Sequence, residues 1–357
     1  MTEIQSIQDR VHAAATAGTA LSIQGGNSKS FYGRSTHGDV LSVKDYQGIL
    51  DYTPSELVIS ARAGTRLTEL ESVLEQEGQM LAFEPAHFAA GATLGGTLAC
   101  AFSGPRRPYA GAARDFVLGV NCINGTGEWL RFGGQVMKNV AGYDVSRTLA
   151  GSLGTLAILL DIHLRVLPRP ETEITLQQSC DAATAIQRCN TWAAQPLPVS
   201  ASCHLDGQLF IRLSGMEQGV QSAAASIGGE PLPDAARFWQ QLREQQLAFF
   251  SGELPLWRVA VPAATGILPF KGDTLLDWGG AQRWLRSEQA ADSIRAITGS
   301  AGGHATLFRG GDRSGEVFHP LQPALLSLHQ RLKKTFDPAG ILNPGRMYRE
   351  LQACKPL

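Results

Sequence analysis

The sequence predicts an α+β protein with two domains, and three features of the 357-residue chain support this. Short alternating apolar runs, which are typical of strands, surround a helical pattern near Leu67 in the first part of the chain. Pro168 and Pro170 then mark a boundary. Beyond it, Ala-rich or amphipathic helical stretches alternate with further strand candidates. A chain of this length is too long for one small core, which agrees with two domains.

The first part of the chain reads as a small mixed unit of helices and strands. The apolar residues of segment 4–11 fall at helical spacing, and Gly18 can end this helix. Strand patterns follow at residues 21–23, 40–43 and 57–60. The periodicity of residues 67–74 predicts a second helix, with Thr65 as its N-cap and Gly78 at its end.

Residues 85–105 carry no formal charge and are long enough to suggest a membrane helix. Four glycines, two prolines and His87 argue against that interpretation, and we expect a buried loop and short helix around a bound group. Further strands are predicted at residues 117–123, 129–132 and 153–160, the first two joined by a turn at 124–127.

The part after the boundary has the texture of a second α+β domain. Helices are predicted at residues 182–194, 218–227 and 233–247, and strands at 209–213 and 257–261. A last helix carries Leu325, Leu328 and Leu332 on one face, and a Gly- and Pro-containing tail, Asp337–Arg346, follows it.

Composition excludes several classes of function. A net charge of -1 provides no field for nucleic acid or an acidic membrane surface. The six cysteines show no metal-ligand or iron–sulfur spacing, and neither do the eight histidines, so we expect no metal and reduced thiols. The N-terminus has acidic residues early and no apolar run, so a signal peptide is not expected. The prediction is a soluble, cytoplasmic protein.

Four glycine-rich segments need a common explanation: Gly25–Ser30, Gly91–Gly96, Ser103–Asp115 and Gly142–Ile158. Glycine is required where the backbone approaches a ligand closely, because a Cβ would occupy the ligand's space. The first segment follows a strand, offers backbone N–H groups and carries Lys29, so it is a candidate diphosphate cradle. The second can open a short helix toward an anion. Each segment alone is equally well explained as a tight turn.

The common nucleotide and hydrolase motifs are missing. The chain has no G-x-x-x-x-G-K-[ST] phosphate loop and no G-x-G-x-x-G after its first strand. Gly151–Gly154 does not have the spacing of a nucleophile elbow. Any nucleotide site must therefore use a different framework.

The order of six motifs resembles the vanillyl-alcohol-oxidase-type FAD flavoproteins, and among them the FAD-binding subunits of bacterial glycolate oxidases. The motifs are Gly25–Ser28, Thr93–Gly96, Arg114–Gly119, Lys138–Asp144, Gly154–Leu156 and Asp337–Gly345. Residues 104–108, 132–134 and 303–308 resemble the glycolate oxidase subunits in particular. The likeness is dense from Leu21 to Pro170 and thins in the middle of the chain.

The resemblance implies a two-subdomain FAD-binding domain of the vanillyl-alcohol-oxidase type with an α+β cap. It would assign residues 1–170 to the FAD-binding domain, 171–315 to the cap or substrate domain, and 316–357 to a segment returning to the FAD-binding domain. The implied FAD-binding residues are Gly25, Gly26, Asn27, Ser28, Lys29, Ser30, Thr93, Leu94, Gly95, Gly96, Ser103, Gly104, Arg114, Asp115, Gly154, Thr155, Ile158 and Asn343. Some relatives carry a flavin-linked histidine where Asn27 stands, so non-covalent FAD is expected here.

The substrate side is less defined. Relatives that oxidise 2-hydroxy acids carry a histidine pair in a Gly-Asp-Gly-Asn-x-His context, which this chain lacks. His304 follows two glycines and is a candidate base, although a structural histidine is the alternative. Tyr143 and Arg106 are candidates for binding a carboxylate, and Arg106 could equally contact FAD or a partner. Lys138 has the same ambiguity.

These features predict an FAD-dependent subunit of a complex that oxidises glycolate, a small 2-hydroxy acid, to glyoxylate. The alternative is a flavin-binding accessory or electron-relay subunit without substrate chemistry. A third possibility is a stand-alone oxidase of sugars or alditols. The expected partners are a catalytic flavoprotein subunit and an iron–sulfur subunit, through which the chain could associate with a membrane.

Overall fold

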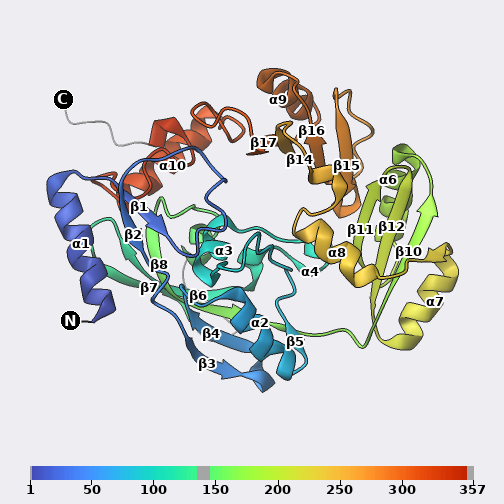
Figure 1. Cartoon of the computed structure of the whole chain (residues 1–357), viewed down its shortest axis with the longest axis horizontal. Helices are drawn as coiled ribbons and strands as arrows, with labels where there is room; N and C mark the ends of the chain where they lie inside the picture. The colour runs from blue at the N-terminus through green and yellow to red at the C-terminus, as the bar shows by residue number, and fades with distance from the viewer. Residues whose placement is uncertain (1, 135–144, 352–357) are drawn as a thin grey trace.

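The protein is built around two large antiparallel sheets that lie side by side along its longest axis (Figure 1). The structure, a computed structural model, describes residues 2–134 and 145–351. The α+β class predicted from the sequence is confirmed. The α-helices of the described residues are α1 Glu3–Ala17, α2 Leu67–Gln76, α3 Leu94–Cys100, α4 Arg107–Ala110, α5 Val145–Leu149, α6 Ala182–Ala193, α7 Glu217–Ile227, α8 Ala235–Arg243, α9 Ala291–Ser300 and α10 Pro323–Phe336.

The first large sheet has the strand order β3-β4-β8-β6-β7. Its strands are β3 Ile49–Thr53, β4 Val58–Arg62, β6 Val117–Asn124, β7 Trp129–Gly133 and β8 Ala157–Arg165. The central strand β8 is buried along almost its whole length, which explains its continuous apolar pattern. Helices α2 and α3 contribute Leu67, Leu70 and Leu98 to the same core.

The predicted elements of this part are present, with two corrections at their ends. The strand expected from residue 153 begins only at Ala157, because Leu153 and Gly154 have φ values of 53° and 69°, which a strand does not accept. Thr65 does not cap α2, whose N-cap is Arg66. Instead the buried Thr65 hydroxyl accepts a hydrogen bond from Gly48 N at 2.9 Å.

A small parallel sheet of β1 Leu21–Gln24 and β2 Asp39–Ser42 lies beside α1 (Figure 1). Thr2 caps α1, and Gly18 ends it in the left-handed conformation at φ 66°, as predicted. The tail after α10 runs along β1: Leu21 N donates to Ile341 O at 2.7 Å, and Asn343 N donates to Leu21 O at 3.0 Å. The C-terminal tail therefore joins β1, the strand that leads into the first glycine-rich loop.

The second large sheet has the order β13-β10-β12-β11-β15-β16-β14-β17. Its strands are β10 Thr172–Ser179, β11 Val199–Leu205, β12 Gln208–Gly215, β13 Glu230–Pro231, β14 Leu256–Ala260, β15 Asp273–Asp277, β16 Gln282–Arg286 and β17 His304–Arg309. β5 Gln79–Met80 and β9 Leu167–Pro168 form an antiparallel pair, and β9 directly precedes β10 in the chain. The region predicted as helices alternating with strands is thus one continuous sheet with helices α6–α9.

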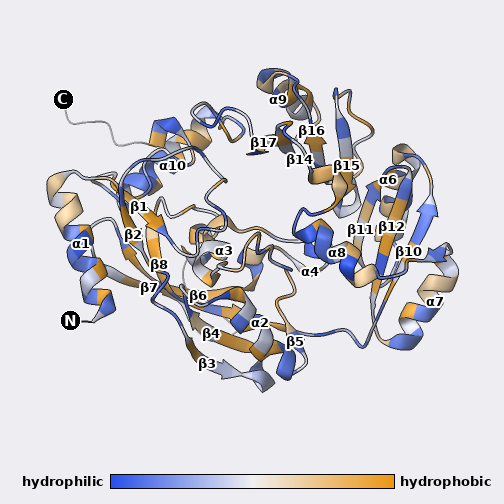
Figure 2. Ribbon diagram, viewed as in Figure 1, coloured by the Kyte–Doolittle hydropathy of each residue, from blue (hydrophilic) through white to orange (hydrophobic). Residues whose placement is uncertain are grey.

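An aromatic core joins the two halves of the protein. Tyr32 and Phe102 from the first half pack in one buried cluster with Trp239, Trp284 and Phe308 from the second. The strands at the centre of both sheets are hydrophobic, whereas α8 is largely hydrophilic (Figure 2). Because rings of this size bury large apolar areas, this cluster holds the second sheet against the first glycine-rich loop.

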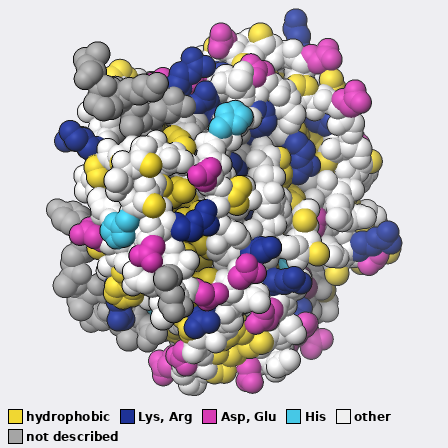
Figure 3. All heavy atoms as spheres, turned by 60° about the vertical axis from the view of Figure 1, so that its left-hand side comes forward, with side chains coloured by type: hydrophobic (Ala, Val, Ile, Leu, Met, Phe, Trp, Pro, Cys, Tyr) yellow, Lys and Arg dark blue, Asp and Glu magenta, His cyan; other side chains and the backbone are white. Residues whose placement is uncertain are grey.

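The outer surface carries no field of a single sign on the face shown in Figure 3, where basic and acidic side chains lie intermingled. This agrees with the net charge of -1. Within residues 2–134 and 145–351, no helix combines the length and apolar character needed to cross a membrane.

Candidate functional site

Two of the glycine-rich segments meet at van der Waals distance beside β1. A Cβ added to Gly26 would lie 1.4 Å from Gly91 O, and one added to Gly25 would lie 2.5 Å from Thr93 Oγ1. Any side chain at these two glycines would therefore push the loops apart. Glycine is therefore required at these two positions because the two loops contact each other. The sequence pattern alone did not distinguish this requirement from close approach of the backbone to a ligand.

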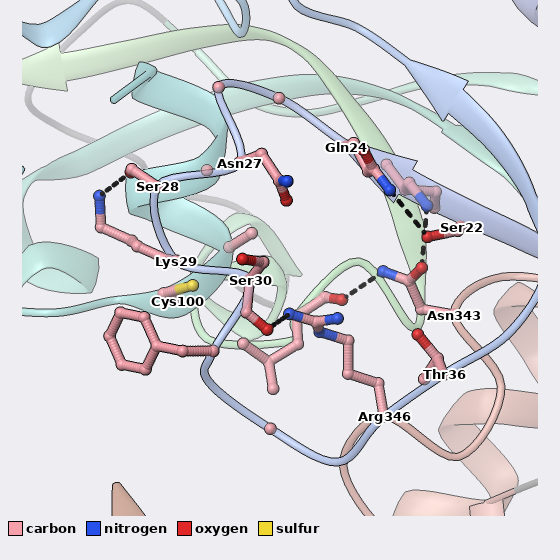
Figure 4. A pocket seen from close by; sticks show the side chains of 18 of the residues that line it. Ser22, Gln24, Asn27, Ser28, Lys29, Ser30, Thr36, Cys100, Asn343 and Arg346 are labelled. Carbon is pink, nitrogen blue, oxygen red and sulfur yellow. Dashed lines mark hydrogen bonds between the residues drawn. The ribbon is translucent and has the colours of Figure 1, made fainter. Parts of the chain in front are cut away.

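These loops form the wall of an open cavity of about 440 Å³ (Figure 4). Nine of the residues predicted to bind FAD line it: Gly25, Gly26, Asn27, Ser28, Lys29, Ser30, Thr93, Gly96 and Asn343. Thr93 caps α3 and its hydroxyl accepts from Gly96 N at 3.3 Å, so the predicted short helix begins at the cavity. A cavity of this size lies in the range of small-molecule and cofactor sites.

The lining of this cavity is basic. Lys29, Arg34, Arg313 and Arg346 line it, and no acidic side chain of the described residues does. Arg34, Arg313 and Arg346 donate to backbone carbonyls and thereby hold the surrounding loops. Burial lowers the pKa of Arg313 to about 10 and raises that of Cys100 to about 11, so at pH 7 the arginine is charged and the thiol neutral.

Of the four basic residues that line this cavity, Lys29 makes the longest hydrogen bonds on average. Its side chain is buried, and its ammonium donates to three neutral oxygens, Ser28 Oγ at 3.3 Å and His87 O and Thr97 Oγ1 at 3.4 Å. These bonds are long for a charged donor. A buried ammonium in this state is well suited to bind an anion that enters the cavity.

Asn343 fixes the cavity floor through its amide. The amide Nδ2 donates to Leu153 O at 2.7 Å, and Oδ1 accepts from Ile23 N at 2.9 Å (Figure 4). One side chain therefore ties β1 to the turn before β8. A Cβ on Gly154 would lie 2.8 Å from this amide nitrogen, which explains the glycine there.

A buried ion pair positions the tail that carries Asn343. Lys333 Nζ, near the end of α10, donates to Asp337 Oδ2 at 2.6 Å, Thr155 O at 2.7 Å and Leu342 O at 2.8 Å. Asp337 also accepts from Leu342 N at 2.7 Å. The ammonium and the carboxylate are thus fully used in shaping the turn that precedes Asn343.

The other residues predicted for FAD lie outside this cavity. Leu94, Gly95 and Ile158 are in the buried core, and Gly95 packs on Ala63. Thr155 is buried and donates to Ser152 O at 2.7 Å. Arg114 and Asp115 are exposed, and Arg114 Nε lies 3.9 Å from Asp115 Oδ1. Their assignment to FAD stays a prediction.

Ser103 and Gly104 line a second, smaller cavity of about 30 Å³ between the two halves of the protein. It is bounded by the rings of Phe88, Phe102 and Phe308 and by the charged side chain of Arg258. Phe31, which lines the first cavity, packs against Phe88 and Phe308 at centroid distances of 5.4 and 5.5 Å. These rings separate the two cavities.

Arg258 enters this second cavity from β14, and within residues 2–134 and 145–351 it forms no ion pair with a carboxylate. Its Nε donates to Gln282 Oε1 at 2.6 Å, and Tyr32 is its other hydrogen-bond partner. Gln282 in turn donates to Asp277 Oδ2 at 2.9 Å, and burial raises the pKa of Asp277 to about 7. The buried Oε1 of Gln245, which also lines the cavity, has no hydrogen-bond partner among the described residues.

Of the three catalytic candidates, the structure describes His304 and Arg106. His304 begins β17, and although the residue as a whole is exposed, partial desolvation of its ring and then the charges of Arg258, His319 and Arg107 lower its pKa. Arg106 pairs with Glu84 and Glu173 and lines neither cavity. Tyr143 and Lys138, together with the motif Lys138–Asp144, lie outside the described residues.

Sequence reasoning did not single out several lining residues. Arg346 directly follows the motif Asp337–Gly345, and its guanidinium donates to Tyr32 O at 2.9 Å. Arg313 and Arg258 stand in no motif, and only the folded chain brings them to the cavities.

Comparison with known proteins places the chain in a family. Residues 1–133 match the family described as FAD binding domain, and residues 281–347 match the C-terminal domain of FAD linked oxidases. The sequence is 48% identical to the glycolate oxidase subunit GlcE of Escherichia coli strain K12 over 347 residues, which are 97% of this chain and 98% of that protein. The chain belongs to the GlcE family of glycolate oxidase subunits.

More distant relatives agree with this assignment. The glycolate oxidase subunit GlcD of Bacillus subtilis strain 168 is 32% identical over 149 residues, which cover 41% of this chain and 32% of that protein. The crystal structure of p-cresol methylhydroxylase with substrate bound matches 98% of this chain and 88% of that chain, at a TM-score of 0.73 and 14% identity. The latter likeness confirms the predicted vanillyl-alcohol-oxidase-type fold.

The first cavity fits the cofactor of this family. The match to the FAD binding domain confirms FAD, and a dinucleotide brings a diphosphate that needs N–H groups and cations. The glycine loop, the start of α3 and Lys29 supply these groups at one wall. No carboxylate of the described residues lines the cavity, so no like charge there repels the diphosphate.

Proposed function

We propose that this protein is the FAD-dependent oxidoreductase subunit of a glycolate-oxidising complex, which converts glycolate to glyoxylate and passes electrons to an acceptor. The observation that carries this proposal is the first cavity, with its glycine contacts, basic lining and position in an FAD binding domain. The E. coli relative is a glycolate oxidase subunit and is similar over nearly its whole length, which supports glycolate as the substrate.

In this proposal the diphosphate lies against Gly25–Ser30 and Thr93–Gly96, with Lys29 as its counter-charge. Asn343 would hold β1 and the turn at Leu153 in the shape that the cofactor needs. Bound FAD supplies the two-electron chemistry that amino-acid side chains lack. Residues 1–170 and 316–357 would form the cofactor domain and residues 171–315 the cap.

The second cavity is the proposed place for the substrate carboxylate. Arg258 offers a half-buried guanidinium whose described hydrogen-bond partners are neutral, and a carboxylate can bind it through two hydrogen bonds. The unpartnered Oε1 of Gln245 can accept a bond from the substrate hydroxyl. A cavity of about 30 Å³ holds groups the size of a few water molecules, which favours a small 2-hydroxy acid.

Replacing Arg258 with methionine should weaken the binding of glycolate about 10- to 150-fold, because a hydrogen-bonded charge contributes roughly 1.5–3 kcal/mol. The apolar replacement keeps much of the packing against Trp278, over which the guanidinium lies at 5.1 Å. The KM for glycolate in the assembled complex measures this effect. Arg237→Met, on the exposed side of α8, is the matched control. An unchanged KM in the Arg258 variant would place the carboxylate elsewhere.

FAD should be released intact when the protein is denatured. Asn27 lines the cavity at φ 56°, and its amide cannot form the covalent link that a histidine forms with flavin in some relatives. After acid precipitation, the flavin should appear in the supernatant, with none in the washed pellet. Flavin fluorescence that stays with the chain on a denaturing gel would contradict non-covalent binding.

The accessory function without substrate chemistry remains the second candidate, because aromatic rings separate the FAD cavity from the one that holds Arg258. Anaerobic addition of glycolate to the isolated subunit distinguishes the two. Bleaching of the flavin supports substrate oxidation by this chain, whereas bleaching only with a partner present supports the accessory function. Both predict a partner flavoprotein and an iron–sulfur subunit, a cytoplasmic location and membrane association only through partners.

A further inference from the structure

The residue after helix α8 buries a carboxylate against the first half of the chain. Glu244 Oε2 accepts from His87 N at 3.0 Å and from Phe88 N at 2.8 Å. Its Oε1 accepts from Arg243 Nε at 2.9 Å. Only 9% of the Glu244 side chain is exposed. The second half of the protein therefore contacts the first through a buried, charge-assisted bond.

The two amides belong to a loop in an unfavourable conformation. Phe88 has a φ of 59°, which is uncommon for a residue with a bulky side chain. Two successive N–H groups at such a turn form a concave site for an anion, and Glu244 fills it. The carboxylate thus stabilises a backbone shape that would otherwise cost free energy.

The same loop holds the ammonium of the cofactor cavity. His87 O accepts from Lys29 Nζ at 3.4 Å, and this nitrogen lies 5.9 Å from the centroid of the Phe88 ring. Burial lowers the pKa of Lys29, and the negative charge of Glu244 opposes this shift. Glu244 therefore acts on Lys29 in two ways, through the loop and through its charge.

We propose that Glu244 is a positioning residue for the cofactor: by fixing the loop at His87 and Phe88, it sets the position of Lys29 and couples docking of the cap to binding of the FAD diphosphate. The proposal rests on the proposed function for the location of FAD in the first cavity. The bound diphosphate and the docked cap then stabilise one arrangement of Lys29, so each should strengthen the other.

A double-mutant cycle tests this coupling. Glu244→Gln removes the charge, and the new NH2 group must face a donor in either orientation, Arg243 Nε or the two backbone amides, so the Kd for FAD should rise about 10-fold, as for loss of a roughly 1.4 kcal/mol contact. In a Lys29→Met background, the same substitution should change the Kd less than about 2-fold, because its target is gone. Glu253→Gln, an exposed glutamate of the same half, is the matched control.

Equal effects in both backgrounds, or a Glu244→Gln variant that binds FAD as the wild type does, would overturn the proposal. If that variant does not fold, hydrogen exchange of the wild-type protein decides: FAD should slow exchange in residues 235–245 as well as in 86–88, and unchanged exchange in 235–245 would overturn the coupling. A wild-type protein that binds no FAD at all would instead refute the proposed function.

Discussion

Gly26→Val should give a folded protein that no longer retains FAD. A Cβ at this position would lie 1.4 Å from Gly91 O and 2.5 Å from Gly91 C, so the loop must move away from the second glycine segment. The movement also displaces the neighbouring Asn27 and Ser28, which line the cavity. FAD binding must then return the loop to its overpacked position, at a cost of roughly 3 kcal/mol. The affinity for FAD should therefore fall about 100-fold or more.

The flavin absorbance of the purified variant measures this loss, and far-UV circular dichroism shows whether the sheets remain. Gly266→Val is the matched control, because a Cβ at Gly266 meets no atom within 4 Å and no left-handed φ is required there. The control should retain FAD. Retained flavin in the Gly26 variant would mean that the loop does not form the diphosphate wall.

Lys333→Met should lower the free energy of unfolding by about 3–5 kcal/mol, the usual cost of removing one member of a buried ion pair. The substitution leaves the carboxylate of Asp337 buried without a cation and the carbonyls of Thr155 and Leu342 without a donor. Because these contacts shape the turn before Asn343, the variant should lose FAD as well.

Urea denaturation followed by tryptophan fluorescence measures the stability change. Lys334→Met is the control, since this neighbouring lysine is exposed and its loss should change stability by less than about 0.5 kcal/mol. If both variants unfold at the same urea concentration, the buried pair does not organise the tail. A Lys333 variant too unstable to purify, beside a normal control, agrees with the expected direction.

Local structure was predictable from the sequence because it follows from short-range patterns. Helix α1 with its Gly18 end, the β6–β7 hairpin and α10 all lie close to their predicted positions. The strand β8 began later than expected because Leu153 is apolar but sits in a left-handed turn, a conformation that periodicity does not report. The order of the predicted helices and strands along the chain likewise did not indicate that the strands between α6 and α9 belong to one eight-stranded sheet.

The residues that line the cavity were only partly predictable, because only some of them belong to short sequence patterns. Gly25–Ser30 and Thr93–Gly96 formed recognisable segments, whereas Arg313 and Arg258 are single residues without a motif. The contact of Gly26 with Gly91 depends on packing between loops 65 residues apart, which no local pattern encodes. Glu244 reaches the cofactor loop only through the tertiary fold.

The most direct test of the cofactor site is an equilibrium titration of flavin-free wild-type protein with FAD, repeated in the presence of ADP. Stoichiometric binding that ADP weakens, as a competing diphosphate should, is the result expected for the cavity lined by Gly25–Ser30 and Lys29. Absence of saturable FAD binding, or FAD binding that ADP leaves unchanged at saturating concentrations, would contradict a diphosphate site in this cavity.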